Sequence, residues 1–211
     1  METVVLLHGL WMSGWAMAAQ RRWLAAGGFA VEVFSFPTVR ETLDHNARSL
    51  AAFARSCTGS RVHLVGHSLG GLVILRMLAA ANEPRLGRAV LLGSPVRGSE
   101  VARSLMRVRW GRAAIGRSLG AWDEASHGDV RWPCDVGMIA GEVAVGAGRL
   151  IAPGLGPNDG TVTVAETRLP SFTDHIVLRV SHTGMLLSRA VADQTCRFLR
   201  TGRFEHRRAA S

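Results

Sequence analysis

The strongest constraint on the fold is an alternation of short apolar runs, each about the length of a β-strand, with longer stretches of helical periodicity. This alternation is typical of proteins in which helices cover both faces of a parallel sheet. The runs are nearly continuously apolar, as expected for strands buried on both faces. The expected strands are 3–7, 30–34, 61–65, 89–92, 136–140 and 176–180. We therefore predict an α/β three-layer sandwich whose mostly parallel sheet has about six strands.

Other segments place apolar residues three and four positions apart, the spacing of an amphipathic helix. The expected helices are 15–26, 42–57, 69–81 and 185–200. The length of 211 residues favours one domain, which we expect to span residues 1–200. An arginine-rich helical insert over 96–133 and a Gly/Pro-rich loop over 146–160 break the alternation. Residues 201–211 are polar, and we expect a disordered tail there.

Composition limits the classes of function. The chain has 25 Lys+Arg and 16 Asp+Glu residues, a net charge of +9, and the basic residues are all arginine. No basic run with interleaved aromatic residues is present, so we expect no nucleic-acid binding. The three cysteines, Cys57, Cys134 and Cys196, fit neither a disulfide framework nor a metal motif. With neither a signal-peptide pattern nor a membrane-length apolar run, the sequence favours a cytoplasmic protein.

A serine stands at the junction between the third expected strand and the helix after it. The residues there read Gly66-His67-Ser68-Leu69-Gly70-Gly71, a Gly-x-Ser-x-Gly pattern. Such a turn strains the serine backbone and leaves no room for a Cβ at position 66 or 70. It lifts the Ser68 hydroxyl above the carboxyl edge of the sheet, beside the N–H groups that start the helix. Ser68 is therefore a candidate nucleophile; the alternative is a tight turn with an inert serine.

At these residues the sequence resembles the α/β-hydrolase family, especially its small bacterial lipases and esterases that lack a large cap. The resemblance extends from His8 and Gly9 to His182 and is weakest across the insert. In this family the catalytic residues follow one another as serine, acid and histidine. Acyl transfer needs a base for the serine, an acid that orients the base, and two donors for the developing oxyanion.

The resemblance implies that His182 is the general base. Of the histidines after Ser68, only His182 follows an apolar strand at its carboxyl end. His175 lies at the other end of that strand, while His127 lies in the insert and His206 in the tail. The alternative is a loop histidine that caps the next helix.

Asp159 is the expected acid, because its Asp-Gly-x-Val sequence resembles the family's acid loop. Glu142, which directly follows the fifth expected strand, is the main rival, and a turn aspartate without a catalytic role is the other alternative. The remaining aspartates considered lie in the insert or before a strand, at the wrong edge: Asp123, Asp129, Asp135 and Asp174.

The resemblance assigns the oxyanion donors to the backbone N–H groups of Leu10 and Leu69. Leu69 follows the nucleophile, and Leu10 follows the first strand and Gly9, which lets the backbone bend. We expect His8 to brace this loop by hydrogen bonding. We interpret His67 as a packing and positioning residue rather than a catalyst.

Apolar residues surround the expected triad, and those predicted to bind substrate are Trp11, Met12, Leu155 and Met185. Buried apolar area supplies about 25 cal/mol per Å² without directional contacts. We therefore expect a small ester substrate with an apolar acyl or aryl group. Trp15, on an expected helix, is equally a core candidate.

The insert alternates arginine with apolar residues. Such a helix could rest on anionic lipid or hold the phosphates of an acyl-thioester carrier, although a solvated face explains it equally. Its arginines include Arg97, Arg103, Arg107, Arg109, Arg112 and Arg117. No zinc-type histidine spacing or phosphate-binding Gly-x-x-x-x-Gly-Lys is present, so we expect neither metal nor cofactor.

The sequence thus predicts a serine hydrolase of carboxylic esters, lipase- or esterase-like, that forms an acyl-enzyme on Ser68. A thioesterase or an acyltransferase would use the same triad. A non-catalytic binding or scaffold protein would keep the same fold, because a fold alone does not establish an activity.

Overall fold

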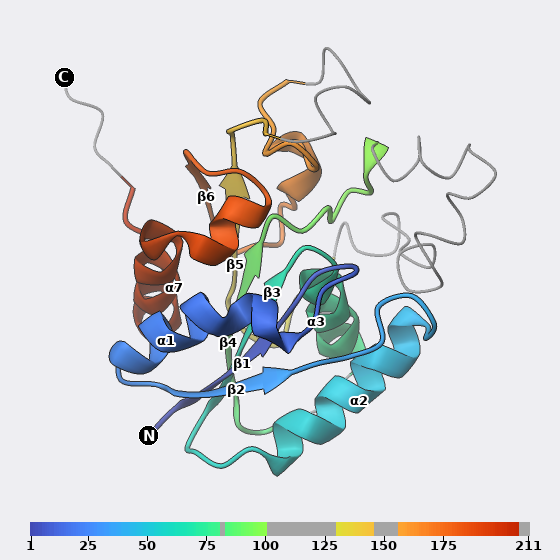
Figure 1. Ribbon diagram of the computed structural model, residues 1–211. Coiled ribbons are helices and arrows are strands. Elements are labelled where there is room, and N and C mark those ends of the chain that lie inside the picture. Colours follow the sequence, from blue (N-terminus) through green and yellow to red (C-terminus); the bar gives the residue numbers. More distant parts are fainter. Residues whose placement is uncertain (81–82, 101–129, 146–155, 207–211) are drawn as a thin grey trace.

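The computed structural model describes residues 1–80, 83–100, 130–145 and 156–206 (Figure 1). The predictions for Leu155 and for most of the insert, including His127, lie outside these residues. The two ends of the insert are described. Val96 and Trp132 are buried there in the hydrophobic core, so the chain enters and leaves the insert from the body of the fold.

Within the described residues, six strands form one sheet in the order β2-β1-β3-β4-β5-β6. Every neighbouring pair is parallel, so the carboxyl ends of all the strands lie at one edge. The strands are β1 (Thr3–Leu7), β2 (Ala30–Phe34), β3 (Val62–His67), β4 (Leu86–Leu92), β5 (Val136–Gly141) and β6 (Asp174–Leu178).

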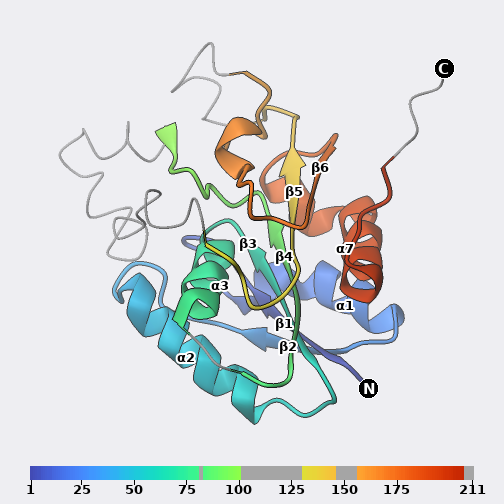
Figure 2. The ribbon, with the colours of Figure 1, turned by 180° about the vertical axis from the view of Figure 1, so that it is seen from behind.

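Helices cover both faces of the sheet (Figures 1 and 2). Helices α1 (Ala18–Ala26) and α7 (Arg189–Thr201) pack together on one face, and α2 (Leu43–Ser56) and α3 (Leu69–Ala80) pack together on the other. Along β1, Val4 and Leu6 join the α1–α7 core while Val5 and Leu7 join the α2–α3 core. Burial on two faces explains the continuous apolar runs, and the predicted α/β sandwich with a parallel sheet is confirmed.

The strand boundaries differ from the predicted ones at both ends, by up to three residues; strand β4 begins at Leu86 rather than at residue 89. Strand β3 continues to His67, the residue before Ser68, rather than stopping at residue 65. Strand β6 begins and ends two residues earlier than the predicted 176–180. The Val180 N–H bonds to the Leu178 carbonyl at 2.8 Å, so the chain turns out of the ladder there.

Two of the predicted helices begin with a separate 3₁₀ turn. One turn, η1 (Gly14–Met17), precedes α1, and the other, η4 (Thr183–Leu187), precedes α7. Ser188 separates η4 from α7, and its hydroxyl accepts a hydrogen bond from the Val191 N–H at 3.4 Å. A serine cap of this kind starts a new helix, so the prediction of one helix over 185–200 was wrong at its first turn.

Residues 201–206 are ordered, in contrast to the disordered tail expected for 201–211. Phe204 is 4% exposed, and its ring lies 4.7 Å from that of Phe198 on α7. The Phe204 N–H also donates to Asp174 Oδ2 at 2.8 Å. The aromatic contact with α7 and the hydrogen bond to β6 together dock this part of the chain.

Candidate active site

Ser68 occupies a sharp turn between β3 and α3. Its φ of 52° lies in the left-handed region, and its N–H donates to the Leu92 carbonyl at 2.8 Å. A Cβ on Gly66 would lie 2.6 Å from the backbone of Gly70, and a Cβ on Gly70 would lie 2.7 Å from the His8 carbonyl. Real Cβ atoms do not approach so closely, so the two glycines are required by the turn.

A hydrogen bond joins His182 and Asp159 at the carboxyl edge of the sheet. The distance from His182 Nδ1 to Asp159 Oδ2 is 2.7 Å, and the two residues are 8% and 1% exposed. The other carboxylate oxygen accepts from the N–H groups of Thr161 at 2.9 Å and Val162 at 2.7 Å. Because the carboxylate accepts, His182 Nδ1 carries the proton, and Nε2 keeps the lone pair that a general base needs.

A backbone hydrogen bond also joins His182 and Asp159. The His182 N–H donates to the Asp159 carbonyl at 2.9 Å. Beyond His182, the buried side chain of Gln20 on α1 donates to the carbonyls of Met185 at 2.8 Å and Ser188 at 3.2 Å. The sequence analysis missed Gln20, although a polar residue on the buried side of an amphipathic segment was a usable signal.

Glycine 93 makes room for the pair. It follows β4 with a φ of 57°, and a Cβ there would lie 3.0 Å from Asp159 Oδ2 and 3.2 Å from His182 Nδ1. The sequence analysis missed Gly93 as well. The available signal was a glycine directly after a buried strand, which marks a close backbone approach.

Glu166 stabilises the loop that carries Asp159. One of its carboxylate oxygens accepts from the Thr163 N–H at 2.7 Å, while its own N–H donates to the Thr163 hydroxyl at 3.1 Å. This reciprocal pair bonds in the manner of a capping box across the turn that leads into η3 (Ala165–Thr167). The second carboxylate oxygen accepts from the Glu100 N–H at 2.6 Å, so Glu166 also ties this loop to the chain that enters the insert.

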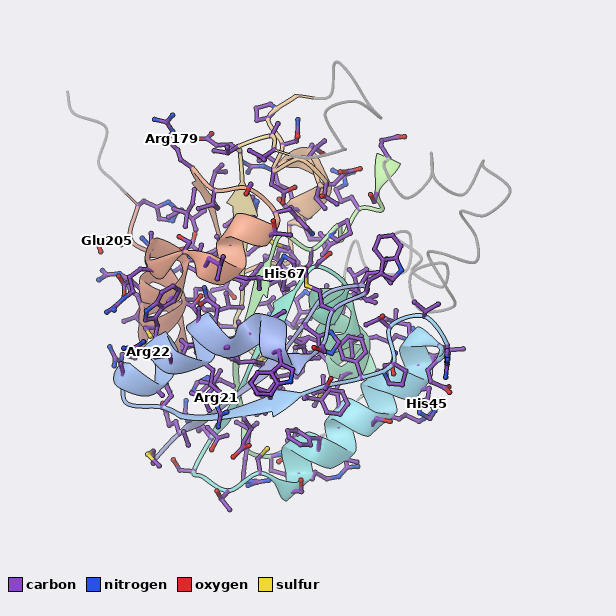
Figure 3. All side chains as sticks on the ribbon, viewed as in Figure 1. Arg21, Arg22, His45, His67, Arg179 and Glu205 are labelled. Carbon is purple, nitrogen blue, oxygen red and sulfur yellow. The ribbon has the colours of Figure 1, made fainter. Side chains whose placement is uncertain are left out.

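His67, the residue directly before Ser68, contacts His182. The ring centroids of His67 and His182 are 4.7 Å apart, and Figure 3 shows His67 well inside the molecule. Within the described part of the chain, no hydrogen bond joins the Ser68 hydroxyl to His182. Catalytic hydrogen bonds are often long or poorly aligned until substrate binds.

His8 fixes the loop after β1. Its Nδ1 donates to the Gly9 carbonyl at 3.0 Å, and its Nε2 accepts from the Phe36 N–H at 3.3 Å. Burial lowers the pKa of His8, which keeps the ring neutral in this arrangement. The Gly9 carbonyl and the Leu10 N–H belong to one planar trans peptide and point in opposite directions. By holding the carbonyl, His8 therefore sets the direction of the Leu10 N–H.

The two predicted oxyanion donors, the N–H groups of Leu10 and Leu69, belong to different segments. Among the described residues, neither the Leu10 N–H nor the Leu69 N–H has a hydrogen-bond acceptor; Leu69 is the first residue of α3, where such groups have no intrahelical partner. The loop after β1 touches the turn at Ser68, because a Cβ on Gly9 would lie 3.2 Å from Ser68 Cβ. Leu69 thus follows Ser68 directly, and Leu10 follows the glycine that approaches Ser68.

Among the described residues, none of the acidic rivals bonds to His182. Glu142 is exposed, and no hydrogen bond connects its carboxylate to His182 in the part of the chain that the structure describes. Asp135 pairs with Arg88 at 3.0 Å, and Asp174 binds the Phe204 N–H; both lie at the start of a strand, at the opposite edge. Asp159 is the carboxylate that contacts His182.

The expected substrate-binding residues differ in exposure. Trp11 is 62% exposed, and Met12 packs against the α1–α7 core with partial exposure. Met185 is completely buried, with its methyl group beneath Gly93 and Gly141. Trp15 is 88% exposed, so it belongs to the surface and not to the core.

The described residues contain no group of three His, Cys, Asp or Glu side chains placed to hold a metal ion. Among the same residues, no helix is long and apolar enough to cross a membrane.

Three comparisons with known proteins relate this chain to hydrolases. A curated 2-hydroxy-6-oxononadienedioate/2-hydroxy-6-oxononatrienedioate hydrolase from Paraburkholderia xenovorans is 36% identical over 104 residues, which cover 44% of this chain and 36% of that relative. The structure of a Bacillus licheniformis lipase in its mature form matches with a TM-score of 0.76 at 21% identity, covering 87% of this chain and 86% of that one. A metagenomic carboxyl esterase matches with a TM-score of 0.70 at 17% identity, covering 85% and 64%.

At such identities the structural matches show the fold alone. The sequence model of the alpha/beta hydrolase family, in contrast, matches residues 4–195, which include Ser68, Asp159 and His182. The match spans most of the chain, and the chain therefore belongs to the alpha/beta hydrolase family.

Proposed function

We propose that this protein is a serine hydrolase that cleaves carboxylic esters through an acyl-enzyme on Ser68. The observation that carries the proposal is the buried 2.7 Å contact between His182 Nδ1 and Asp159 Oδ2, together with a serine at a φ of 52° whose preceding residue, His67, packs its ring against that of His182. An inert turn serine needs neither a partnered imidazole beside it nor two N–H groups free to bind an anion. Membership of the alpha/beta hydrolase family supports the same conclusion.

In the proposed reaction, His182 Nε2 takes the proton from the Ser68 hydroxyl as its oxygen attacks the ester carbonyl carbon. The Leu10 and Leu69 N–H groups stabilise the negative charge that develops on the carbonyl oxygen. The C–O bond then breaks, and His182 gives the proton to the leaving alcohol. His182 next takes a proton from a water whose oxygen attacks the acyl carbon; the bond from this carbon to Ser68 Oγ then breaks, and His182 returns the proton to Ser68 Oγ as the carboxylic acid leaves.

Asp159 would stabilise the imidazolium that forms twice in this cycle. Its carboxylate already accepts two backbone N–H groups and the imidazole, so it is held in place before the proton moves. A charge-assisted hydrogen bond between oppositely charged groups in a dry site is stronger than the neutral bond it replaces. The positive charge that develops on the imidazole as Ser68 loses its proton is thereby stabilised.

The proposed substrate has an apolar acyl or aryl group, because Trp11 and Met12 lie in the loop that presents the Leu10 N–H. A hydrophobic wall beside the oxyanion donors would orient such a group. Contact with anionic lipid or with an acyl carrier through the insert remains a prediction, since most of the insert lies outside the described residues.

The test combines a covalent probe with substrate turnover. A fluorophosphonate should label the wild type at Ser68, and Ser68→Ala should lose both the label and the hydrolysis of p-nitrophenyl esters. Ser60→Ala, an exposed serine before β3 at the opposite edge, is the matched control and should keep both. Asp159→Asn should keep the label site but lower kcat by at least about 100-fold, as expected when the base is held in the wrong tautomer.

A wild type that is neither labelled nor able to turn over any ester would refute the proposal and favour the alternative of a non-catalytic scaffold protein. Turnover of thioesters, or transfer to an added alcohol, without net ester hydrolysis would point to the thioesterase or acyltransferase alternative.

A further inference from the structure

His67, the residue before the proposed nucleophile, is completely buried and carries an unusual combination of contacts. Its Nε2 lies 3.0 Å from the carbonyl oxygen of His182. Its other ring nitrogen, Nδ1, has no hydrogen-bond partner among the described residues. A buried polar side chain with one specific partner and one bare nitrogen suggests a role beyond filling space.

The contacts determine which nitrogen carries the proton. A carbonyl oxygen can only accept, so His67 Nε2 must be the N–H, and Nδ1 is left with a lone pair. The reverse tautomer would bury an unpaired N–H and would leave the His182 carbonyl without this donor. Burial, reinforced by the neighbouring His182, lowers the pKa of His67 to about 3, so the ring stays neutral near neutral pH.

The ring of His67 separates two loops that meet at Ser68. On one side it holds the backbone of His182. On the other, its Nδ1 faces the loop after β1, where a Cβ on Gly9 would lie 2.9 Å from that nitrogen. The first loop carries the proposed base, and the second presents the Leu10 N–H. The in-plane width of one imidazole therefore spaces the backbone of His182 from the loop that carries Leu10.

We propose that His67 is a positioning residue that fixes the His182 backbone relative to the oxyanion loop through its Nε2–H donor. This inference rests on the proposed function of His182. Because the His182 N–H is bonded to the Asp159 carbonyl, the bond from His67 fixes the second backbone group of the same residue. His182 is then left with only side-chain rotation, which its bond to Asp159 restrains.

Paired substitutions separate a donor role from a packing role. His67→Gln keeps an N–H donor at nearly the reach of Nε2, whereas His67→Leu keeps apolar bulk without a donor. We expect His67→Leu to lower kcat by about 10–100-fold with KM changed little, because a small displacement of the base acts on the chemical step. His67→Gln should recover most of the loss. His63→Leu, a buried histidine at the other end of β3, is the control for general destabilisation and should keep the wild-type kcat.

Equal kcat values for His67→Leu and the wild type would overturn the proposal. Equal losses in His67→Leu and His67→Gln, beyond the loss in His63→Leu, would also overturn it, because the donor would then not be the relevant property.

A measurement on the unmodified protein covers the case in which a variant does not fold. Side-chain ¹⁵N shifts should show His67 as the Nε2–H tautomer from pH 5 to 9, and an Nδ1–H or charged ring would contradict the proposal. The low-field ¹H signal of the His182 Nδ1–H should be sharp in the wild type and in His67→Gln, and broadened or lost in His67→Leu. These spectra need no turnover, so a wild type inactive on esters would refute the proposed function while leaving this inference open to its own test.

Discussion

Adding a single methyl group at Gly93 offers a stringent test of the site. The Cβ of Gly93→Ala would press on Asp159 Oδ2 at 3.0 Å, on His182 Nδ1 at 3.2 Å and on the Met185 methyl at 3.2 Å. Contacts this short force each neighbour to move by a few tenths of an ångström. Two of the three neighbours form the hydrogen bond on which the proposed chemistry depends, so the substitution acts on the base and on its carboxylate together.

Gly28 provides the matched control. Its φ of 88° is also left-handed, but a Cβ there would meet no atom within 4 Å. Gly28→Ala therefore measures only the free-energy cost of placing an alanine in left-handed backbone, which is about 1–2 kcal/mol. Gly93→Ala has this cost and an overpacking cost of about 1–3 kcal/mol. The difference between the two variants isolates the contacts with the Asp159–His182 pair.

The expected effects are large enough to resolve. For a chain of this size, about 2–4 °C of Tm is lost per kcal/mol, so Gly28→Ala should lower Tm by about 2–8 °C and Gly93→Ala by about 4–20 °C. Gly28→Ala should keep the wild-type kcat on p-nitrophenyl esters. Gly93→Ala should lose roughly tenfold or more in kcat, because misplacing catalytic groups by a fraction of an ångström to one ångström is costly. A Gly93→Ala variant that matches Gly28→Ala in both Tm and kcat would refute the reasoning.

Three further predictions concern stability and reactivity. Burial lowers the pKa of His67 from 6.5 to about 3, so the unfolded chain binds its proton more tightly. The stability contributed by the neutral ring is present above pH 6.5 and is lost on acidification, at up to about 1.4 kcal/mol per pH unit for this one residue. Urea unfolding from pH 7 to 4 should show a shallower pH dependence in His67→Gln, and equal slopes would argue against it. In Glu166→Gln, an amide N–H₂ would face one of the two backbone N–H donors, and the free energy of unfolding measured in urea should fall by about 1–3 kcal/mol. The exposed Glu142→Gln is the control and should lower it by less than about 0.5 kcal/mol. Similar losses in the two variants would contradict the anchoring role of Glu166. Burial raises the pKa of Cys134 to about 12, so iodoacetamide at pH 8 should modify it far more slowly in the folded protein than in denaturant, and rapid native labelling by mass spectrometry would disprove this.

The sheet and its order along the chain were predictable, because strands buried on two faces must be apolar at every position. Thr3–Leu7 and Ala30–Phe34 were predicted to the residue. The boundary of β3 was not, because Gly66 and His67 do not look like strand residues. They belong to β3 for a tertiary reason, since the turn at Ser68 holds them against β4.

The break before α7 was harder to find. Apolar residues recur at helical spacing through both η4 and α7, so periodicity alone favours one continuous helix. Ser188 carried the missing information, because a serine three residues before Val191 can cap a helix. Such a residue reads equally well as an ordinary helical position until its hydrogen bond is seen.

At the site, residues with reactive side chains were easier to identify than those that hold the backbone. Ser68, Asp159 and His182 stand out because their residue types and order along the chain resemble the family's motifs. Gly93 and Gln20 act through a missing Cβ and through bonds to main-chain carbonyls. Neither effect leaves a motif, because each depends on a segment that is distant in sequence and near in space.

Because backbone hydrogen bonds hold Asp159 and His182 in place, substitutions elsewhere in the site can change the substrate without moving these two residues. The Asp159 carboxylate accepts hydrogen bonds from the backbone N–H groups of residues 161 and 162, and the His182 N–H donates to the Asp159 carbonyl. Peptide groups are the same whatever side chain they bear, short of proline. Trp11, which is predicted to bind substrate and is 62% exposed, can thus be replaced as substrates change, while the reactive groups keep their alignment.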